Sequence, residues 1–314
     1  MAQKIIAVVG ATGKQGGGVV RAILNDASNE FAVRAITRKR DSVSAQELAK
    51  LGVEVVEGDL DNQASIERAF AGAYGAFCLT NFFDHWSPEK ETEQAKTQAR
   101  AAKAAGLKHV VWSTLEDTRQ SMPLSDGRMP TLMGNYKVPH FDAKGSADAT
   151  FVELGIPTTF LRTSFYWENM IDMGLGPQRG PDGKLAITMP MGDKALPGMA
   201  VNDIGKCVNT LFKLGQAYIG KTIGIVGEKL TGNQMAAALT QALGESVLYN
   251  DVPADVYRGF GFPGAEEVGN MFQFKRDFEH VWSGNRNLEL SKSLNPSMLT
   301  FDAWLDRNKS RIPV

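Results

Sequence analysis

Three glycines with fixed spacing, Gly10, Gly13 and Gly16, follow a short apolar run. A segment with helical character starts at the third glycine. In such a context the first glycine permits a tight turn, the second lets backbone approach a pyrophosphate, and the third lets the helix pack close to a sheet. Amide groups at a helix start also favour bound phosphate. The pattern predicts a dinucleotide-binding turn rather than an ordinary loop, with these predicted contacts: Gly10, Thr12, Gly13, Lys14, Gln15 and Gly16.

A basic run, residues 38–40, ends the second predicted strand. NAD-selective proteins place an acidic residue about 20 residues past the glycines, where it accepts the ribose hydroxyls. The guanidinium of Arg38 would instead bind a 2′-phosphate through paired, charge-assisted hydrogen bonds. The sequence therefore favours NADP(H) over NAD(H). The alternatives are a solvated basic loop, or a ribose contact from the nearby Asp41.

Polar residues follow the third and fourth predicted strands. The carboxyl ends of parallel strands face the ligand crevice of an α/β sheet. Asp59 and Leu60 are expected at the adenine edge, and Thr80 and Asn81 near the ribose and nicotinamide. Capping and turn roles fit the same spacing nearly as well.

The elements that would position these residues alternate between short apolar runs and longer helical segments, as in βαβ units around a parallel sheet. The strand candidates are residues 5–9, 32–36, 54–57, 75–79, 110–113 and 158–162. The helix candidates are residues 16–25, 44–51, 63–71, 90–105 and 142–154. Gly52, Gly106 and Gly155 are expected to end helices in the left-handed conformation. Right-handed crossovers then build a doubly wound sheet.

The alternation stops after residue 162. We expect a strand at 184–189, a helix from about 202 to 214, a strand at 222–226 that rejoins the sheet, a helix at 231–243, a strand at 247–249 and mostly helix beyond. The predicted fold is an α/β Rossmann domain over residues 1–163, with segments near 198–228 returning to it. Residues 164–197 and 229–314 are expected to form a smaller, mixed, mainly helical lobe.

Composition excludes several classes of protein. The 314 residues carry 34 Lys and Arg against 35 Asp and Glu, and the net charge of −1 provides no basic field for nucleic acid or anionic lipid. Two distant cysteines and four scattered histidines form no disulfide framework and no metal site. Apolar runs shorter than about 20 residues indicate no membrane span, and no signal peptide is recognised. We expect a cytoplasmic protein.

The motifs together resemble the NmrA-like family, atypical members of the short-chain dehydrogenase/reductase superfamily, and are similar to the branch that contains the vertebrate NADPH sensor. The segments that carry the resemblance are GATGKQG at 10–16, TR at 37–38, GDL at 58–60, STLE at 113–116, PHFDAKG at 139–145 and RTSFYWEN at 162–169. The resemblance implies a Rossmann lobe, a small C-terminal lobe, NADP(H) binding and, in some branches, regulation through a protein partner.

Catalysis would depend on His140 and Lys144. In active short-chain reductases a tyrosine lies one helical turn before this lysine; the resemblance places His140 there. Residues four apart share a helix face, and a lysine cation favours neutral imidazole, a poor proton donor. We therefore expect loss of classical carbonyl reduction, while Lys144 still binds the ribose. Ser113 matches the superfamily's catalytic hydroxyl, although it could equally cap a strand.

A second set of aromatic and polar residues follows the sixth predicted strand. Tyr166 is a candidate proton donor over the nicotinamide, and Phe165 a pocket wall; the alternative is that both are core. Asn169 resembles the family's cofactor-contacting asparagine. Tyr136 is a weak substitute for the missing tyrosine, because Pro139 should interrupt any helix that joins it to Lys144.

Met271, Phe274, Phe278, Val281 and Trp282 recur at helical spacing and are interpreted as core of the small lobe; a partner-binding stripe is the alternative. The favoured function is an NADP(H)-binding redox sensor or regulator with weak or no classical dehydrogenase activity, acting through a protein partner, with a homodimer left open. The alternatives are an NADPH-dependent reductase of a small apolar carbonyl, quinone or imine, and a scaffold with a purely structural cofactor.

Overall fold

The computed structural model describes residues 3–314, which pack as two units. Unit 1 runs to Asp117 and resumes at His140–Arg162 and Val201–Ile223. Unit 2 comprises Thr118–Pro139, Thr163–Ala200 and Gly224–Val314. The segment Thr118–Pro139 lies within the range expected for the first lobe, but by its packing it belongs to unit 2.

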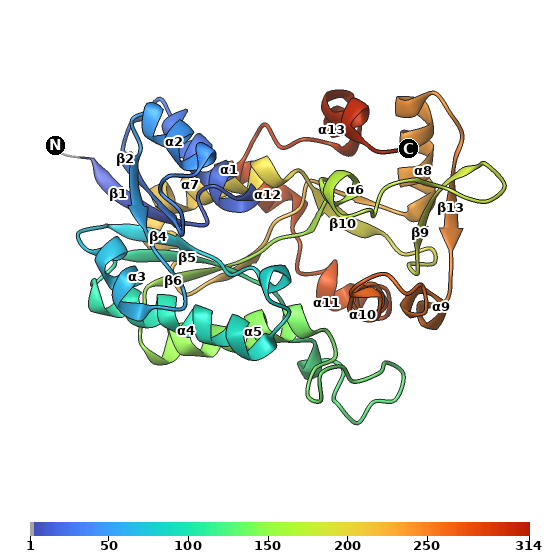
Figure 1. Ribbon diagram of the computed structural model, residues 1–314, viewed down its shortest axis with the longest axis horizontal. Helices are drawn as coiled ribbons and strands as arrows, with labels where there is room; N and C mark the ends of the chain where they lie inside the picture. Colours follow the sequence, from blue (N-terminus) through green and yellow to red (C-terminus); the bar gives the residue numbers. More distant parts are fainter. Residues whose placement is uncertain (1–2) are drawn as a thin grey trace. The chain divides into compact units, whose positions relative to one another are not determined.

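A seven-stranded sheet forms the centre of unit 1, in the order β11-β6-β5-β4-β1-β2-β3 (Figure 1). Its strands are β1 Lys4–Val9, β2 Phe31–Thr37, β3 Glu54–Glu57, β4 Gly75–Cys78, β5 His109–Thr114, β6 Thr158–Arg162 and β11 Thr222–Gly224. All neighbouring strands from β6 to β3 in this order pair in parallel. The predicted doubly wound sheet is confirmed, and the strand expected at 222–226 joins its edge as the shorter β11.

The strand order reverses at β1, because the chain builds outward to β2 and β3 and then returns to place β4 on the other side. Such a switch point opens a crevice at the carboxyl ends of the two adjacent strands, where α/β proteins bind ligands. The glycine turn follows β1, and Thr80 lies just beyond β4, so both lie at this switch point.

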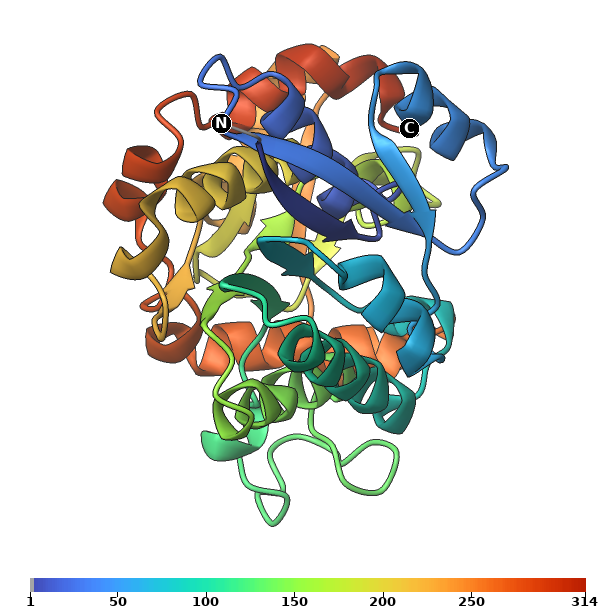
Figure 2. The same cartoon turned by 90° about the vertical axis from the view of Figure 1, so that its left-hand side faces the viewer.

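Helices cover both faces of the sheet, with α3, α4 and α5 on one face and α1 and α7 on the other (Figure 1). Figure 2 shows α4 and α5, in teal and green, beside the strands from another direction. The helices of unit 1 are α1 Lys14–Leu24, α2 Val43–Lys50, α3 Gln63–Phe70, α4 Pro88–Ala104, α5 Pro139–Glu153 and α7 Val201–Leu214, with short 3-10 turns at Phe82–Asp84 and Gly215–Ala217.

Local signals set the ends of these helices. Proline opens α4 at Pro88 and α5 at Pro139, two or three residues before the predicted starts. Proline suits the first helical position, since its fixed φ is helical and the missing N–H has no intrahelical acceptor there. Gly52, Gly106 and Gly155 have φ values of 82°, 62° and 63°, as predicted for left-handed residues that follow helices.

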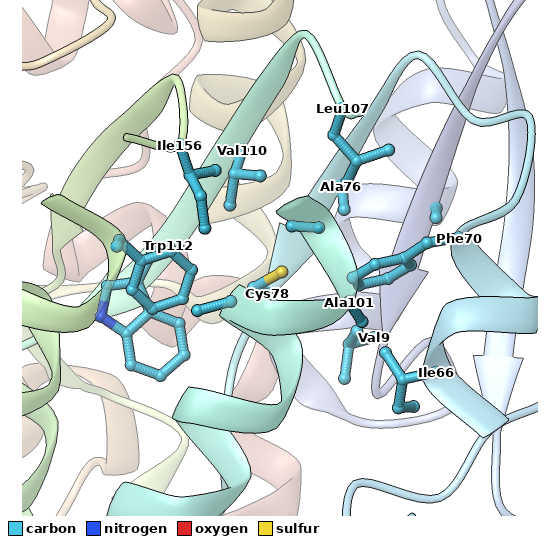
Figure 3. Close-up of a cluster of buried hydrophobic side chains, with 14 of the residues drawn as sticks. Val9, Ile66, Phe70, Ala76, Cys78, Ala101, Leu107, Val110, Trp112 and Ile156 are labelled. Carbon is cyan, nitrogen blue, oxygen red and sulfur yellow. The ribbon is translucent and has the colours of Figure 1, made fainter. Parts of the chain in front are cut away.

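The face under α3, α4 and α5 encloses a continuous apolar core (Figure 3). Cys78 and Trp112 lie at its centre, and the Trp112 ring stacks on Phe151 with centroids 5.1 Å apart. Full burial of each large apolar side chain is worth about 2 kcal/mol. This core fixes the strands whose carboxyl ends carry the candidate site.

Unit 2 combines small sheets with short helices. One sheet is formed by β7 Phe165–Tyr166, β10 Leu196–Met199 and β12 Glu228–Leu230, and another by β8 Gln178–Arg179, β9 Leu185–Met189 and β13 Val247–Asp251. The helices are α6 Asn169–Asp172, α8 Gly232–Leu243, α9 Ala254–Arg258, α10 Ala265–Asp277, α11 Glu279–Trp282, α12 Leu288–Leu294 and α13 Phe301–Asn308, with 3-10 turns at Thr118–Gln120 and Lys309–Arg311. This mixed, mainly helical region agrees with the predicted fold class.

The apolar stripe of residues 271–282 does not lie on one helix as predicted. Phe278, with φ −116° and ψ 42°, interrupts the helix between α10 and α11. The side chains of Met271, Phe274, Phe278 and Trp282 are nevertheless buried, and Phe274 and Phe278 stack with centroids 5.3 Å apart. These four therefore belong to the core.

Candidate cofactor site

The glycine turn after β1 has no room for a side chain at Gly16. Gly10 has a φ of 62°, and its carbonyl accepts the Gly13 N–H at 2.8 Å. A Cβ on Gly16 would lie 2.3 Å from the Gly10 carbonyl oxygen, well inside van der Waals contact. The backbone at the start of α1 therefore needs glycine, as predicted for a turn that packs a helix tightly against the strand before it.

Gly13 is the N-cap of α1 and supplies no side-chain cap. The first amides of a helix lack intrahelical acceptors, and a helix start favours negative charge. A phosphate fits this chemistry, because it supplies the acceptors that an Asp or Ser cap would otherwise provide. Gln15, in the first turn, accepts a hydrogen bond from Ser113 Oγ at 2.8 Å, which ties the end of β5 to the turn.

Arg38 extends from the end of β2 with its side chain 72% exposed. Its Nη2 donates to Asp84 Oδ2 at 3.0 Å, and Asn81 Nδ2 donates to the other oxygen of the same carboxylate at 2.7 Å. Asp84 thus brings two predicted cofactor residues together. Asp84 was not predicted as a site residue, because an aspartate in an aromatic loop gives no signal of its own.

Asp59 makes turn contacts, whereas the N-cap of α3 is Asn62. Asp59 Oδ1 accepts the Asp61 N–H at 3.0 Å, and the Asp59 N–H donates to Ser65 Oγ at 3.2 Å. Leu60 borders a polar groove lined by residues of α3 and α4. Contacts of Asp59 and Leu60 with adenine stay predictions.

Lys144 is bound on all its donor positions by groups of unit 1. Its Nζ lies 2.7 Å from the Thr80 carbonyl oxygen, 2.6 Å from Thr80 Oγ1 and 2.5 Å from Glu91 Oε1. An ammonium has three N–H donors, so these three acceptors match its full capacity. Glu91 is completely buried, and Thr80 Oγ1 donates to it at 2.7 Å. Glu91, which sequence reasoning missed, is therefore the partner that neutralises Lys144.

His85 faces the second oxygen of this carboxylate. Its Nε2 lies 3.3 Å from Glu91 Oε2, without hydrogen-bond alignment, while its Nδ1 accepts the Ser87 N–H at 3.1 Å. A neutral imidazole that accepts at Nδ1 carries its proton on Nε2. The Nε2 hydrogen of neutral His85 therefore lies on the side of the Glu91 carboxylate.

His140 lies one turn before Lys144 on α5, as predicted, and its ring packs against Phe83 and Phe141 with centroids 5.2 and 4.6 Å away. Its exposed fraction is 7%. The prediction for His140 took Lys144 as a lone cation beside this imidazole. That picture is incomplete, because the Glu91 carboxylate offsets the charge of the ammonium.

Asp148 lies one further turn along α5 and was also missed. Its Oδ1 accepts Thr114 Oγ1 at 2.6 Å and Trp112 Nε1 at 2.8 Å. Burial raises the pKa of Asp148 to about 7, and these two hydrogen bonds oppose the shift. The helix thus places a titrating carboxyl against the end of β5.

The remaining predicted residues, Phe165, Tyr166 and Asn169, belong to unit 2, whereas the glycine turn, Arg38 and Lys144 belong to unit 1. Tyr166 Oη lies 2.8 Å from Thr163 Oγ1, and burial raises the pKa of Tyr166 to about 12, which weakens it as an acid. Phe165 is buried and Asn169 begins α6. Their roles toward a cofactor stay predictions.

Tyr136 also belongs to unit 2 and pairs with Leu132 through backbone hydrogen bonds. Tyr136 precedes α5, which begins at Pro139, so Tyr136 and Lys144 do not lie on one helix. The expectation that Pro139 separates Tyr136 from the helix of Lys144 is confirmed.

The NmrA-like family model matches residues 2–305. The chain belongs to the NmrA-like family. It is 32% identical over 291 residues to the NmrA-like family domain-containing oxidoreductase FrzB of a Cladobotryum species, covering 86% of this chain and 83% of that protein. The family prediction is confirmed; the placement near the vertebrate sensor branch stays a prediction, since these relatives are fungal.

Solved structures share the fold. NmrA, a negative transcriptional regulator in complex with NADP, superimposes with a TM-score of 0.79 at 24% identity, over 98% of this chain and 95% of that one. Triphenylmethane reductase of a Citrobacter species, complexed with NADP(H), superimposes with a TM-score of 0.75 at 21% identity, over 97% of this chain and 99% of that one.

Within residues 3–314, no helix is both long enough and apolar enough to cross a membrane.

Proposed function

We propose that this NmrA-like protein binds NADP(H) and acts as a redox-state sensor or regulator with weak or no classical dehydrogenase activity. The observation that carries the proposal is the turn at Gly10, Gly13 and Gly16, which leads into an α1 start with no side-chain cap. Arg38, at the end of the adjacent strand, supplies the charge for a 2′-phosphate. When bound, the cofactor would supply the hydride chemistry.

Contacts at the three superfamily positions support weak classical activity. Ser113 donates to Gln15, Lys144 is matched by Thr80 and Glu91, and His140 is buried among aromatic rings. None of these three residues is a tyrosine whose phenol could donate a proton to a carbonyl. The glycine turn and Arg38, which would bind the phosphates, are not among these three positions.

A sensor has two conformations or assemblies, and the oxidised and reduced cofactors must favour them to different extents. A cofactor that binds both states equally well does not change the equilibrium between them. We test this by calorimetric titration with NADPH, NADP⁺ and NADH, followed by light scattering and pull-down with each bound form. If the protein is a sensor, we expect tight binding of both NADPH and NADP⁺. We also expect the oligomeric state or the bound partner to differ between the NADPH-bound and the NADP⁺-bound protein. Absence of measurable NADPH binding removes the proposal.

The second candidate is an NADPH-dependent reductase of a small apolar carbonyl, quinone or imine, favoured by the oxidoreductase names of the fungal relatives. Hydride transfer to an activated substrate needs mainly positioning. Steady-state NADPH oxidation across a panel of such compounds decides between the two. If turnover appears, a loss in Tyr166→Phe but not in His140→Ala assigns the proton donor to Tyr166.

A further inference from the structure

The ion pair between Arg38 and Asp84 involves the residue on which NADP selectivity depends. The two residues are 46 positions apart in sequence and both belong to unit 1. Arg38 donates through Nη2 at 3.0 Å, and both side chains are well exposed, at 72% and 44%. A ligand phosphate therefore has open access to the same guanidinium.

Asp84 is held in place rather than carried on a free loop. Asn81 Nδ2 binds its second carboxylate oxygen at 2.7 Å, and the 3-10 turn Phe82–Asp84 sets its backbone. The Trp86 N–H closes this turn on the Phe82 carbonyl at 2.7 Å, with Trp86 at a φ of 56°. A non-glycine residue is disfavoured in that region and persists only where the surrounding structure requires it.

Two anions cannot share one guanidinium edge without repulsion. A carboxylate and a phosphate both match the arginine fork, and like charges close together disfavour each other. The other charged groups of the loop after β2 are Lys39, Arg40 and Asp41. Asp84 is the acidic group with a defined hydrogen bond to Arg38.

We infer that Asp84 is a specificity-determining residue: its carboxylate competes with the cofactor's 2′-phosphate for Arg38 and so reduces the preference for NADP(H) over NAD(H). The inference rests on the proposed NADP(H) binding. NAD(H) lacks the 2′-phosphate, so its affinity does not depend on release of Arg38. The selectivity ratio, rather than overall affinity, is therefore the quantity that Asp84 controls.

The test is Asp84→Asn, which keeps the size of the side chain and an oxygen for Asn81. Since exposed ion pairs are worth up to about 1 kcal/mol, we expect the Kd for NADP⁺ to fall about fivefold, and that for NAD⁺ to change by less than about twofold. Adenosine 2′,5′-bisphosphate, measured against AMP, should show the same ratio. The gain should shrink in high salt, where exposed charges are screened.

The matched control is Glu54→Gln, which removes the β3 carboxylate that binds Arg34 of β2 at 2.8 Å. It should leave the NADP⁺ to NAD⁺ ratio unchanged. In an Arg38→Ala background Asp84→Asn should have no effect on that ratio, because the carboxylate acts through the guanidinium. Thermal unfolding confirms that each variant is folded.

Two outcomes overturn the inference while the proposed function survives. An unchanged NADP⁺ affinity in Asp84→Asn means that Asp84 does not compete. Weaker NAD⁺ binding means that Asp84 accepts the ribose hydroxyls, the role of an acidic residue in NAD-selective proteins. Failure of the unsubstituted protein to bind either nucleotide is a different result and removes the proposed function itself.

Discussion

Gly16 has no space for a side chain, and this is the residue-scale constraint on which cofactor binding depends. A Cβ there would lie 2.3 Å from the Gly10 oxygen and 2.7 Å from the Val9 oxygen, both rigid backbone atoms. At Gly17, one position along, the nearest atoms would be Arg21 Nη1 at 3.2 Å and the Ala11 carbonyl oxygen at 3.3 Å, about 1 Å farther than the nearest atom at Gly16.

We therefore expect Gly16→Ala to weaken NADPH binding by more than about tenfold and to destabilise the protein by about 2 kcal/mol, because the turn must open to admit the methyl group. Gly17→Ala is the control and should stay near the unsubstituted protein in both quantities. Fluorescence titration and urea unfolding measure them. Normal NADPH binding by Gly16→Ala would contradict the assignment of this turn to the pyrophosphate.

Glu91 is the second residue-scale case, since it neutralises the mostly buried Lys144. Glu91→Gln leaves the ammonium without a carboxylate, and breaking a buried pair costs about 3 kcal/mol. Glu93→Gln is the matched control on the same helix, because Glu93 pairs with Arg100 in an exposed ion pair. It should cost less than about 1 kcal/mol in urea unfolding. Equal costs would show that Lys144 does not depend on Glu91.

At the scale of elements, α1 and α7 pack backbone to backbone. A Cβ on Gly205 of α7 would lie 2.1 Å from the Gly18 carbonyl oxygen of α1. The reverse is not true, because a Cβ on Gly18 would meet its nearest atom, Asn202 Cα, at 3.5 Å, an ordinary contact. The pair is reinforced by Arg21, whose Nη2 donates to Asn202 Oδ1 at 2.6 Å.

This asymmetry predicts that Gly205→Ala separates the two helices and costs about 3 kcal/mol of unfolding free energy. Gly18→Ala should change stability by less than about 1 kcal/mol, since alanine also improves helix propensity. Thermal and urea unfolding of the two variants provide the comparison. A tolerated Gly205→Ala would mean that the helices are not in contact at this point.

At the scale of the whole molecule, two buried groups give the unfolding free energy opposite dependences on pH. The pKa of Asp148 is raised to about 7 by burial. Its stabilising contribution is full below the unfolded value near 4 and is lost as pH rises through 7, in total about 4 kcal/mol. Burial lowers the pKa of His109 to about 4. Its contribution is lost as pH falls from about 6.5 to 4, in total about 3 kcal/mol.

Asp148→Asn should separate these effects, because an amide still accepts hydrogen bonds from Thr114 and Trp112 but does not ionise. The free energy of unfolding of the variant, relative to that of the unsubstituted protein, should rise by about 4 kcal/mol between pH 4 and pH 8. Urea unfolding across this range measures the difference. A difference in unfolding free energy between Asp148→Asn and the unsubstituted protein that stays constant with pH would contradict the raised pKa of Asp148.

Local sequence was enough to predict the strands of the parallel sheet and the glycine turn. The bounds of β3 and β6 agree with prediction to the residue, and Gly52, Gly106 and Gly155 have the left-handed conformation expected of them. These features depend on local sterics, periodic burial and capping, which neighbouring residues specify. The interruption at Phe278 was missed, because an apolar stripe continues across it without a proline or glycine signal.

Which charged residues pair with one another depends on long-range packing. Glu89, Glu91 and Glu93 are chemically alike on α4, yet only Glu91 of the three is buried and meets Lys144 from a distant helix. Asp84 meets Arg38 across 46 positions of sequence. The order of the strands in the sheet decides which distant segments lie next to each charged residue. A local sequence pattern does not specify such long-range neighbours.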